Sequence, residues 1–123
     1  MSLAALRGLV AVLLLAGTAL EPLPASAHAI VVSASPADGA VLASGDAPVL
    51  LRFNSRIDHQ RSRLSLIAAD GSTTVLPVDP AASTDSLVAR LVGLPPGQYR
   101  LRWQVLALDG HITRGDIPFT VKP

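Results

Sequence analysis

Beyond residue 28, apolar and polar residues alternate in short segments, which is the pattern of β-strands that bury one face. The alternation is clearest between Tyr99 and Val105, where every second residue is apolar and the residues between are arginine or glutamine. Turn-forming pairs such as Asp70-Gly71 separate the segments, and no segment has the helical period. The pattern therefore predicts about seven strands, over residues 29–33, 49–53, 64–68, 73–78, 86–91, 99–105 and 117–121.

Short strands with regularly spaced turns predict an all-β sandwich with Greek-key connections. The last strand is expected to follow a turn that spans Asp109–Gly115. Tyr99 follows Leu94-Pro95-Pro96-Gly97 at the start of a strand, which is the position of a tyrosine corner. We therefore expect the role of Tyr99 to be structural and not catalytic.

Residues 1–27 have the composition of a secretory signal peptide. A short segment with one positive charge (1–7) precedes an apolar run (8–20), which is shorter than the roughly 20 residues that span a bilayer. The small residues Ala25-Ser26-Ala27 form a cleavage site. We therefore expect a cleaved signal peptide over residues 1–27 and a single exported, periplasmic domain over residues 28–123.

Charge and sulfur content narrow the range of partners. The formal net charge is +1 and no run of like charges occurs, so the sequence gives no sign of the basic patch that nucleic acid or an acidic polymer requires. The chain has no cysteine, and its single methionine is Met1, which leaves with the leader. Because soft ions such as Cu(I) prefer thiolate and thioether ligands, no soft-metal site is expected from the mature chain alone.

Cleavage after Ala27 leaves His28 as the first residue of the mature protein. An N-terminal histidine offers both its free α-amine and its imidazole Nδ1 to one metal ion. Asp109 and His111, with Gly110 between them, add a carboxylate and a second imidazole, and both are expected to point the same way from an extended backbone. Such a set of nitrogen and oxygen donors is the preference of Cu(II) or Ni(II).

Each of these residues also has a simpler interpretation. Asp109 could merely cap a turn, and His111 could be an exposed loop histidine. His59 lies in the polar stretch Asp58-His59-Gln60-Arg61 and is expected to be a solvated loop residue, or with Asp58 a weak accessory site. The combination of His28, Asp109 and His111 in a sulfur-free exported domain, rather than any one residue, favours metal binding.

Several segments, taken in order, resemble the CopC family of periplasmic copper-binding proteins along nearly the whole mature chain. Each segment is a weak signal alone, whereas their order and spacing together are specific. The matching segments are His28-Ala29, Ser35-Pro36-Ala37-Asp38-Gly39-Ala40, Val49-x-Leu51-x-Phe53, Leu94-Pro95-Pro96-Gly97-x-Tyr99-Arg100-x-x-Trp103, Asp109-Gly110-His111 and Gly115 to Val121.

The resemblance implies an immunoglobulin-like Greek-key β-sandwich of about seven strands. It also implies a copper-handling or copper-resistance protein that binds one Cu(II) per chain through His28, Asp109 and His111, often beside a CopD-type inner-membrane copper transport protein. Two-site members carry a methionine-rich Cu(I) site, which this chain lacks, so it looks like a Cu(II)-only member. Some members have a glutamate where this chain has Asn54. Nothing in the sequence indicates an obligate dimer, and we expect a monomer.

Two other functions compete with copper binding. A histidine brace also occurs in copper-dependent oxidative enzymes, but here Asp109 would fill a coordination position and the four aromatic residues fall on predicted inward faces. We therefore expect no enzyme activity. The other alternative is a metal-free structural β-sandwich. The start of the first strand must lie beside the turn before the last strand if the copper interpretation is right.

Overall fold

The computed structural model describes residues 29–123, which form strands and one short 3-10 turn. No helix in this part of the chain is long and apolar enough to cross a bilayer. The elements are β1 (Val31–Ser35), β2 (Ala40–Leu42), β3 (Ala47–Phe53), the 3-10 turn η2 (His59–Arg61), β4 (Arg63–Ala68), β5 (Thr73–Leu76), β6 (Ser86–Leu91), β7 (Gly97–Leu106) and β8 (Ile112–Val121).

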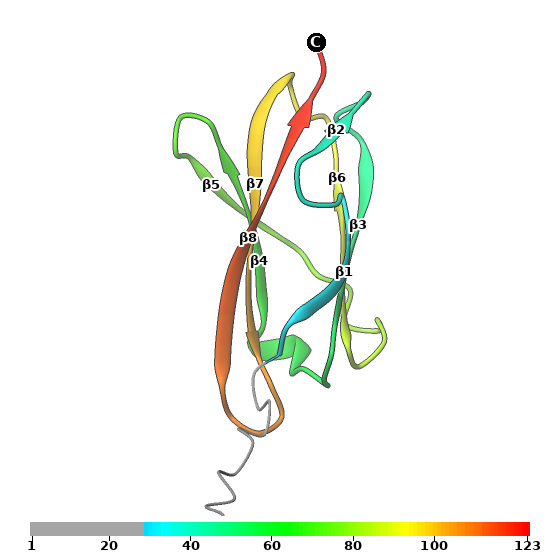
Figure 1. The fold of residues 1–123 in the computed structure, drawn as a ribbon, viewed down its shortest axis with the longest axis vertical. Helices are drawn as coiled ribbons and strands as arrows, with labels where there is room; N and C mark the ends of the chain where they lie inside the picture. The colour runs from blue at the N-terminus through cyan, green and yellow to red at the C-terminus, as the bar shows by residue number, and fades with distance from the viewer. Residues whose placement is uncertain (1–28) are drawn as a thin grey trace, which may run out of the picture.

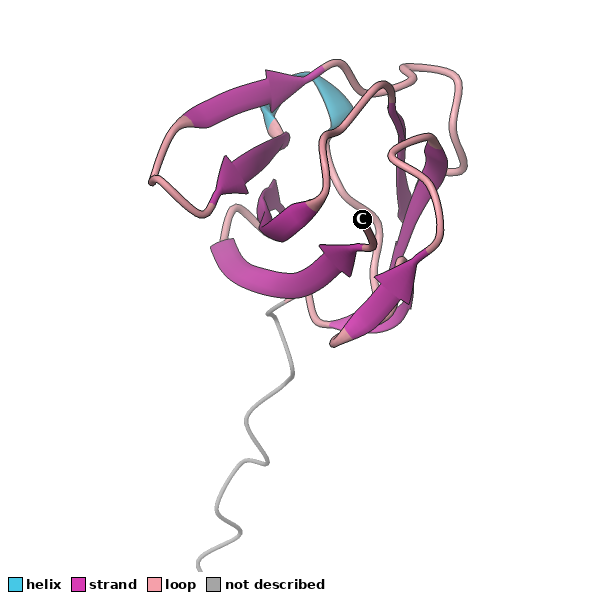
Figure 2. Cartoon of the chain, turned by 90° about the horizontal axis from the view of Figure 1, so that it is seen from above, coloured by secondary structure: helices cyan, strands magenta, loops and turns pink. Residues whose placement is uncertain are grey.

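The strands form two sheets that pack face to face, as seen across the long axis in Figure 1 and along it in Figure 2. One sheet has the order β1-β3-β6 and the other the order β2-β8-β7-β4-β5. All pairs are antiparallel except β2 with β8, which is parallel. The chain crosses between the sheets several times, for example from β3 to β4 and from β6 to β7. The predicted all-β Greek-key sandwich is confirmed.

The core lies between the sheets and contains the residues that the alternation placed there. Tyr99, Leu101, Trp103 and Val105 of β7 are all buried. The ring of Trp103 meets the ring of Phe53 edge to face, with centroids 5.3 Å apart. Because each buried aromatic side chain removes a large apolar area from water, this contact between the sheets stabilises a domain that has no disulfides.

Two predicted turns are confirmed. The hydroxyl of Tyr99 donates a hydrogen bond to the carbonyl of Pro95, which is the contact of a tyrosine corner. Asp70-Gly71 forms the β4–β5 hairpin, in which Gly71 has a φ of +84° and Asp70 accepts a hydrogen bond from the backbone of Ser72. Both turns lie at the end of the sandwich opposite to the β7–β8 turn.

The strand prediction differs from the structure most in two places. A short eighth strand, β2, pairs with β8, and its three residues were too few to give a recognisable alternation. The last strand begins at Ile112 and not after Gly115, so the expected turn over Asp109–Gly115 is much shorter. Gly115 lies within β8 opposite Trp103. The position requires glycine, because a Cβ there would stand only 2.6 Å from the indole ring. The glycine therefore makes room for the tryptophan and does not mark a turn.

Candidate metal centre

The candidate metal centre lies on the tight turn between β7 and β8. Ala107 and His111 close this turn through a backbone hydrogen bond from the Ala107 N–H to the His111 carbonyl. The Gly110 N–H donates to the Ala107 carbonyl, and Gly110 has a φ of +89°, which residues with a side chain rarely adopt. A three-residue loop of this kind holds its flanking residues in fixed positions at the end of a rigid hairpin.

Asp109 and His111 lie together on this turn. The Asp109 Oδ1 accepts a hydrogen bond of 3.0 Å from the His111 N–H, and the Asp109 Oδ2 lies 3.3 Å from the His111 Nδ1. The expectation of an extended backbone was wrong, because the backbone turns at Gly110 and the carboxylate bridges that turn. Asp109 therefore caps the turn and also places one oxygen beside the imidazole. Both side chains are partly exposed, at 37% for Asp109 and 55% for His111.

The described chain begins beside this turn, at the lower end of the molecule in Figure 1. The hydroxyl of Thr113, two residues after His111, donates a 2.9 Å hydrogen bond to the carbonyl of Ala29. Ala29 is buried in the core. The start of the first strand thus lies next to the turn before the last strand, as the copper interpretation required.

A second residue holds the same segment. The side chain of Asn54 accepts a hydrogen bond of 2.8 Å from the Ile30 N–H, and the Asn54 N–H donates to the Ile30 carbonyl at 3.0 Å. The Asn54 side chain and backbone therefore fix the backbone near the start of the domain. His28 itself, the remaining predicted ligand, lies outside the described residues.

His59 has a different role from the one expected. Its Nε2 lies 2.7 Å from the carbonyl of Ser86, and the side chain is half-buried rather than solvated. Asp58 caps η2, because its Oδ1 accepts hydrogen bonds from the backbone of Gln60 and Arg61. The prediction of a solvated loop histidine was therefore wrong. Both side chains are engaged in holding the loop, and the geometry gives no support to an accessory metal site there.

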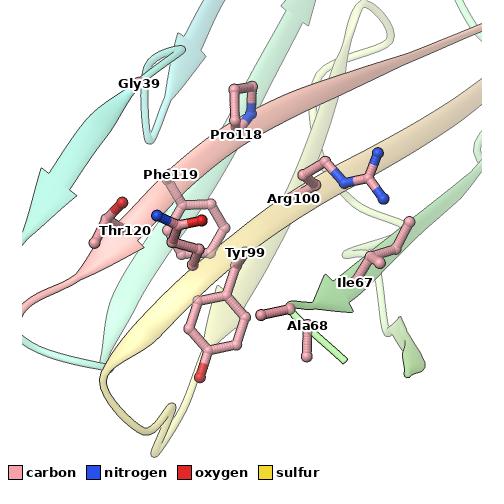
Figure 3. Close-up of a pocket in the computed structure, with 10 residues that line it drawn as sticks. Gly39, Ile67, Ala68, Tyr99, Arg100, Pro118, Phe119 and Thr120 are labelled. Carbon is pink, nitrogen blue, oxygen red and sulfur yellow. The ribbon is translucent and has the colours of Figure 1, made fainter. Parts of the chain in front are cut away.

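No group of three or more histidine, cysteine, aspartate or glutamate side chains is placed to hold a metal within residues 29–123. Asp109 and His111 supply two donors, and a complete site needs more from another part of the protein. The hollow drawn in Figure 3 lies at the opposite end of β7 and β8, where Tyr99, Arg100 and Pro118 are among the residues that line it. Its lining contains no histidine or acidic side chain, so it is no alternative metal site.

The sequence patterns did not identify Asn54 and Thr113 as residues of this region. Thr113 contacts a residue 84 positions away in the chain, and Asn54 contacts one 24 positions away. Neither spacing belongs to a local motif. Only the pairing of β1 with β3 and of β7 with β8 brings these side chains to the start of the domain.

Comparison with known proteins gives a consistent result. The CopC domain matches residues 31–122, which is most of the chain. The copper transport protein CutJ of Bacillus subtilis (strain 168) is 27% identical over 103 residues, which cover 81% of this chain and 19% of that protein. The chain therefore spans about a fifth of the length of this curated relative.

Two solved structures share the fold. CopC from Methylosinus trichosporium OB3b superposes with a TM-score of 0.70 at 29% identity, covering 78% of this chain and 95% of that one. PcoC, a methionine-rich copper resistance protein from Escherichia coli, superposes with a TM-score of 0.62 at 30% identity, covering 78% of this chain and all of that one. The family match over residues 31–122 and the agreement of fold with these structures lead to one conclusion: the chain belongs to the CopC domain family.

Proposed function

We propose that the protein binds one Cu(II) per chain through an N-terminal histidine brace and two side chains of the β7–β8 turn. The ligands in this proposal are the α-amine and imidazole of His28, the carboxylate of Asp109 and the imidazole of His111. The family match supports a copper-related role. The number and identity of the ligands, and the oxidation state, are our proposal.

The observation that carries the proposal is the hydrogen bond between Thr113 and Ala29. It ties the residue next to His28 to the strand that begins just after His111. Because consecutive Cα atoms are about 3.8 Å apart, a residue bonded to Ala29 starts within reach of this turn. If the two had lain at opposite ends of the sandwich, no such ligand set would be possible.

The donors at the turn suit a small divalent ion. Nitrogen and oxygen ligands stand roughly 2.0–2.2 Å from such an ion, so two of them on one ion lie about 3 Å apart. The 3.3 Å between the Asp109 Oδ2 and the His111 Nδ1 is close to that separation. Imidazole, amine and carboxylate donors favour Cu(II), which stands highest in the stability order of the divalent ions.

The same chemistry argues against a Cu(I) site. PcoC is described as methionine-rich, whereas the single methionine of this chain is Met1. A chain cleaved after Ala27 would have no thiolate or thioether ligand. We therefore propose a Cu(II)-only protein, without copper exchange between two sites of different oxidation state.

We further propose that residues 1–27 are a cleaved signal peptide and that residues 28–123 act in the periplasm as a monomer. Cleavage there produces the free amine that the brace needs, so export and assembly of the site are coupled. Relatives named for copper transport and copper resistance support a role in sequestering or delivering copper. A CopD-type inner-membrane protein is the proposed partner for delivery.

Binding, rather than catalysis, is the activity we propose. An oxidative enzyme that works on a polymer needs an exposed, often aromatic, surface around its copper. The four aromatic residues of this chain are buried in the core. They are Phe53, Tyr99, Trp103 and Phe119.

Calorimetric titration of the mature protein with Cu(II) tests the proposed ligands at the turn. Asp109→Asn keeps an oxygen to cap the turn but removes the charge, and His111→Ala removes the imidazole. We expect each to weaken Cu(II) binding by more than the roughly 10–100-fold that loss of a supporting partner costs in metal sites. His59→Gln is the matched control and should bind as the parent protein does. Unchanged affinity in both turn variants would refute the proposal.

A further inference from the structure

The outward face of the five-stranded sheet collects arginines that are scattered in the sequence. The outward residues of β7 alternate with its buried ones and include Arg100 and Arg102. Pairing across the strands places Arg63 of β4 and Arg114 of β8 on either side of Gln104. Side chains at laterally paired positions on one face of a sheet are direct neighbours. We call these four residues, Arg63, Arg100, Arg102 and Arg114, the arginine face.

The arginine face is more basic than the chain as a whole. Its four cations are accompanied on β4, β7 and β8 by a single acidic side chain, that of Asp116. The face therefore carries a net charge of about +3, whereas the formal charge of the whole chain is +1. Nothing in the sequence indicated this group of arginines, because alternation along the strands separates them in sequence but gathers them on one side of a sheet.

Asp116 pairs with only two of the four arginines of the arginine face. It accepts hydrogen bonds of 2.9 and 3.0 Å from Arg102 and one of 3.2 Å from Arg100. The hydrogen bond from Arg102 lowers the pKa of Asp116, so the carboxylate stays charged. No carboxylate of residues 29–123 forms an ion pair with Arg63 or Arg114. Two exposed guanidinium groups thus remain available to an external anion.

The arginine face is continuous with an apolar edge at the end of the sandwich that carries the β7–β8 turn. Leu106 pairs with Ile112 in the row beyond Arg114, and Ile112 is 57% exposed. Leu108, on the turn itself, is 67% exposed. A hollow lined by Arg102, Gln104, Arg114, Gly115 and Asp116 lies between this apolar edge and the middle of the sheet. Cations next to exposed aliphatic side chains are the composition of surfaces that bind the interface of an anionic membrane.

We propose that the arginine face docks the protein on an anionic phospholipid bilayer, with the β7–β8 turn at the membrane. The proposal rests on the proposed function, since export is what brings the domain to such a membrane. Docking in this orientation would hold the Asp109 and His111 end of the sandwich close to a membrane partner that receives or supplies copper. The attachment is peripheral and reversible, because few aliphatic side chains contribute to it.

The observations favour a lipid surface over an acidic protein. Binding sites for proteins concentrate their energy in buried aromatic and arginine anchors that fill matching pockets. The aromatic residues of this chain are buried in the core, and Arg63 and Arg114 are exposed on separate strands of an open sheet. Cations that lie apart on an open face can each bind a lipid headgroup, because headgroups can move to contact them. An acidic protein as the partner is an outcome that the experiment below distinguishes.

Sedimentation of the mature protein with vesicles tests the proposal. We expect binding to vesicles of phosphatidylglycerol and phosphatidylcholine in equal parts, no binding to pure phosphatidylcholine, and loss of binding as salt is added. The double variant R63Q/R114Q should bind the anionic vesicles about 25-fold more weakly, at roughly fivefold for each arginine. The matched control is R52Q/R90Q, which makes the same change in charge at exposed positions on the other sheet and should bind nearly as the parent does.

Each outcome of the vesicle experiment either supports the docking proposal or overturns it. Equal weakening in both double variants would mean that net charge alone attracts the protein, and it would overturn the docking face. Absence of binding by the parent protein would also overturn it and leave an acidic protein as the partner for this face. Cu(II) titration of R63Q/R114Q distinguishes the two proposals, because its copper affinity should equal that of the parent whether or not vesicles bind.

Discussion

Asp109 shows how one side chain can serve the fold and the proposed site together. Its Oδ1 accepts the His111 N–H and fixes the turn, while its Oδ2 lies 3.3 Å from the His111 Nδ1. The two interpretations of the Asp-x-His motif, a turn cap and a metal ligand, are therefore compatible and not exclusive. In the proposed site, the cap would orient the carboxylate before a metal binds, which would reduce the ordering cost of binding.

Thr113 and Asn54 are the residues that we expect to position His28. Replacing Thr113 with valine keeps the shape of the side chain but leaves the Ala29 carbonyl without its donor. We expect Thr113→Val to weaken Cu(II) binding about 10-fold, the lower end of the effect of supporting partners in metal sites. The Cu(II) EPR spectrum should also change, because the histidine brace would be less well held.

Thr113→Ser is the control for this prediction, since serine keeps the hydroxyl. It should restore the affinity and the spectrum of the parent protein. If Thr113→Val lowers the melting temperature but leaves copper affinity and EPR spectrum unchanged, the hydrogen bond to Ala29 stabilises the fold only and does not position a ligand.

At the scale of elements, the β7–β8 hairpin carries both the core and the proposed site. Its inward residues pack against β3 through the contact of Trp103 with Phe53, and its turn holds Asp109 and His111. A displacement of Trp103 should therefore affect the structure of the whole hairpin. Gly115, directly opposite Trp103, is the position where such a displacement can be introduced.

We expect Gly115→Ala to destabilise the protein, because the added Cβ would stand 2.6 Å from the indole Cζ2 of Trp103. Forcing extra atoms into a packed core costs about 1–3 kcal/mol. Thermal unfolding should show a lower melting temperature, and the near-ultraviolet circular dichroism of Trp103 should change.

Gly93→Ala is the matched control for this packing effect. Gly93 has a positive φ of 64°, but a Cβ there would meet nothing within 4 Å. It should cost about 1 kcal/mol through backbone strain alone and leave the tryptophan spectrum unchanged. Equal effects on the tryptophan spectrum in both variants would contradict the packing argument at Gly115.

At the scale of the whole molecule, the sandwich could be predicted because each strand of the core alternates clearly. Val49, Leu51 and Phe53 face inward as expected, and so do the apolar residues of β7. The short strand β2 could not be predicted, because three residues are too few to show a period. Gly115 was misread as part of a turn, because a glycine that accommodates a large ring looks the same in sequence as one that bends the chain.

Only part of the candidate site could be predicted, because only some of its residues belong to a local sequence motif. Asp109 and His111 are only two positions apart in sequence, so a local motif reveals them. The contacts of Thr113 and Asn54 with the start of the domain join segments far apart in the chain, and only the sheet pairing brings them together. The arginine face is likewise a product of the register between β4, β7 and β8.

The central claim is that a free N-terminal histidine completes a Cu(II) site with Asp109 and His111. The most direct measurement is a Cu(II) titration, with EPR, of two purified forms of the domain. One form begins at His28, and the other has a single glycine before it. The account predicts tight one-to-one binding by the first form and a large loss of affinity, with a different EPR spectrum, in the second. Equal binding and identical spectra in both forms would contradict it.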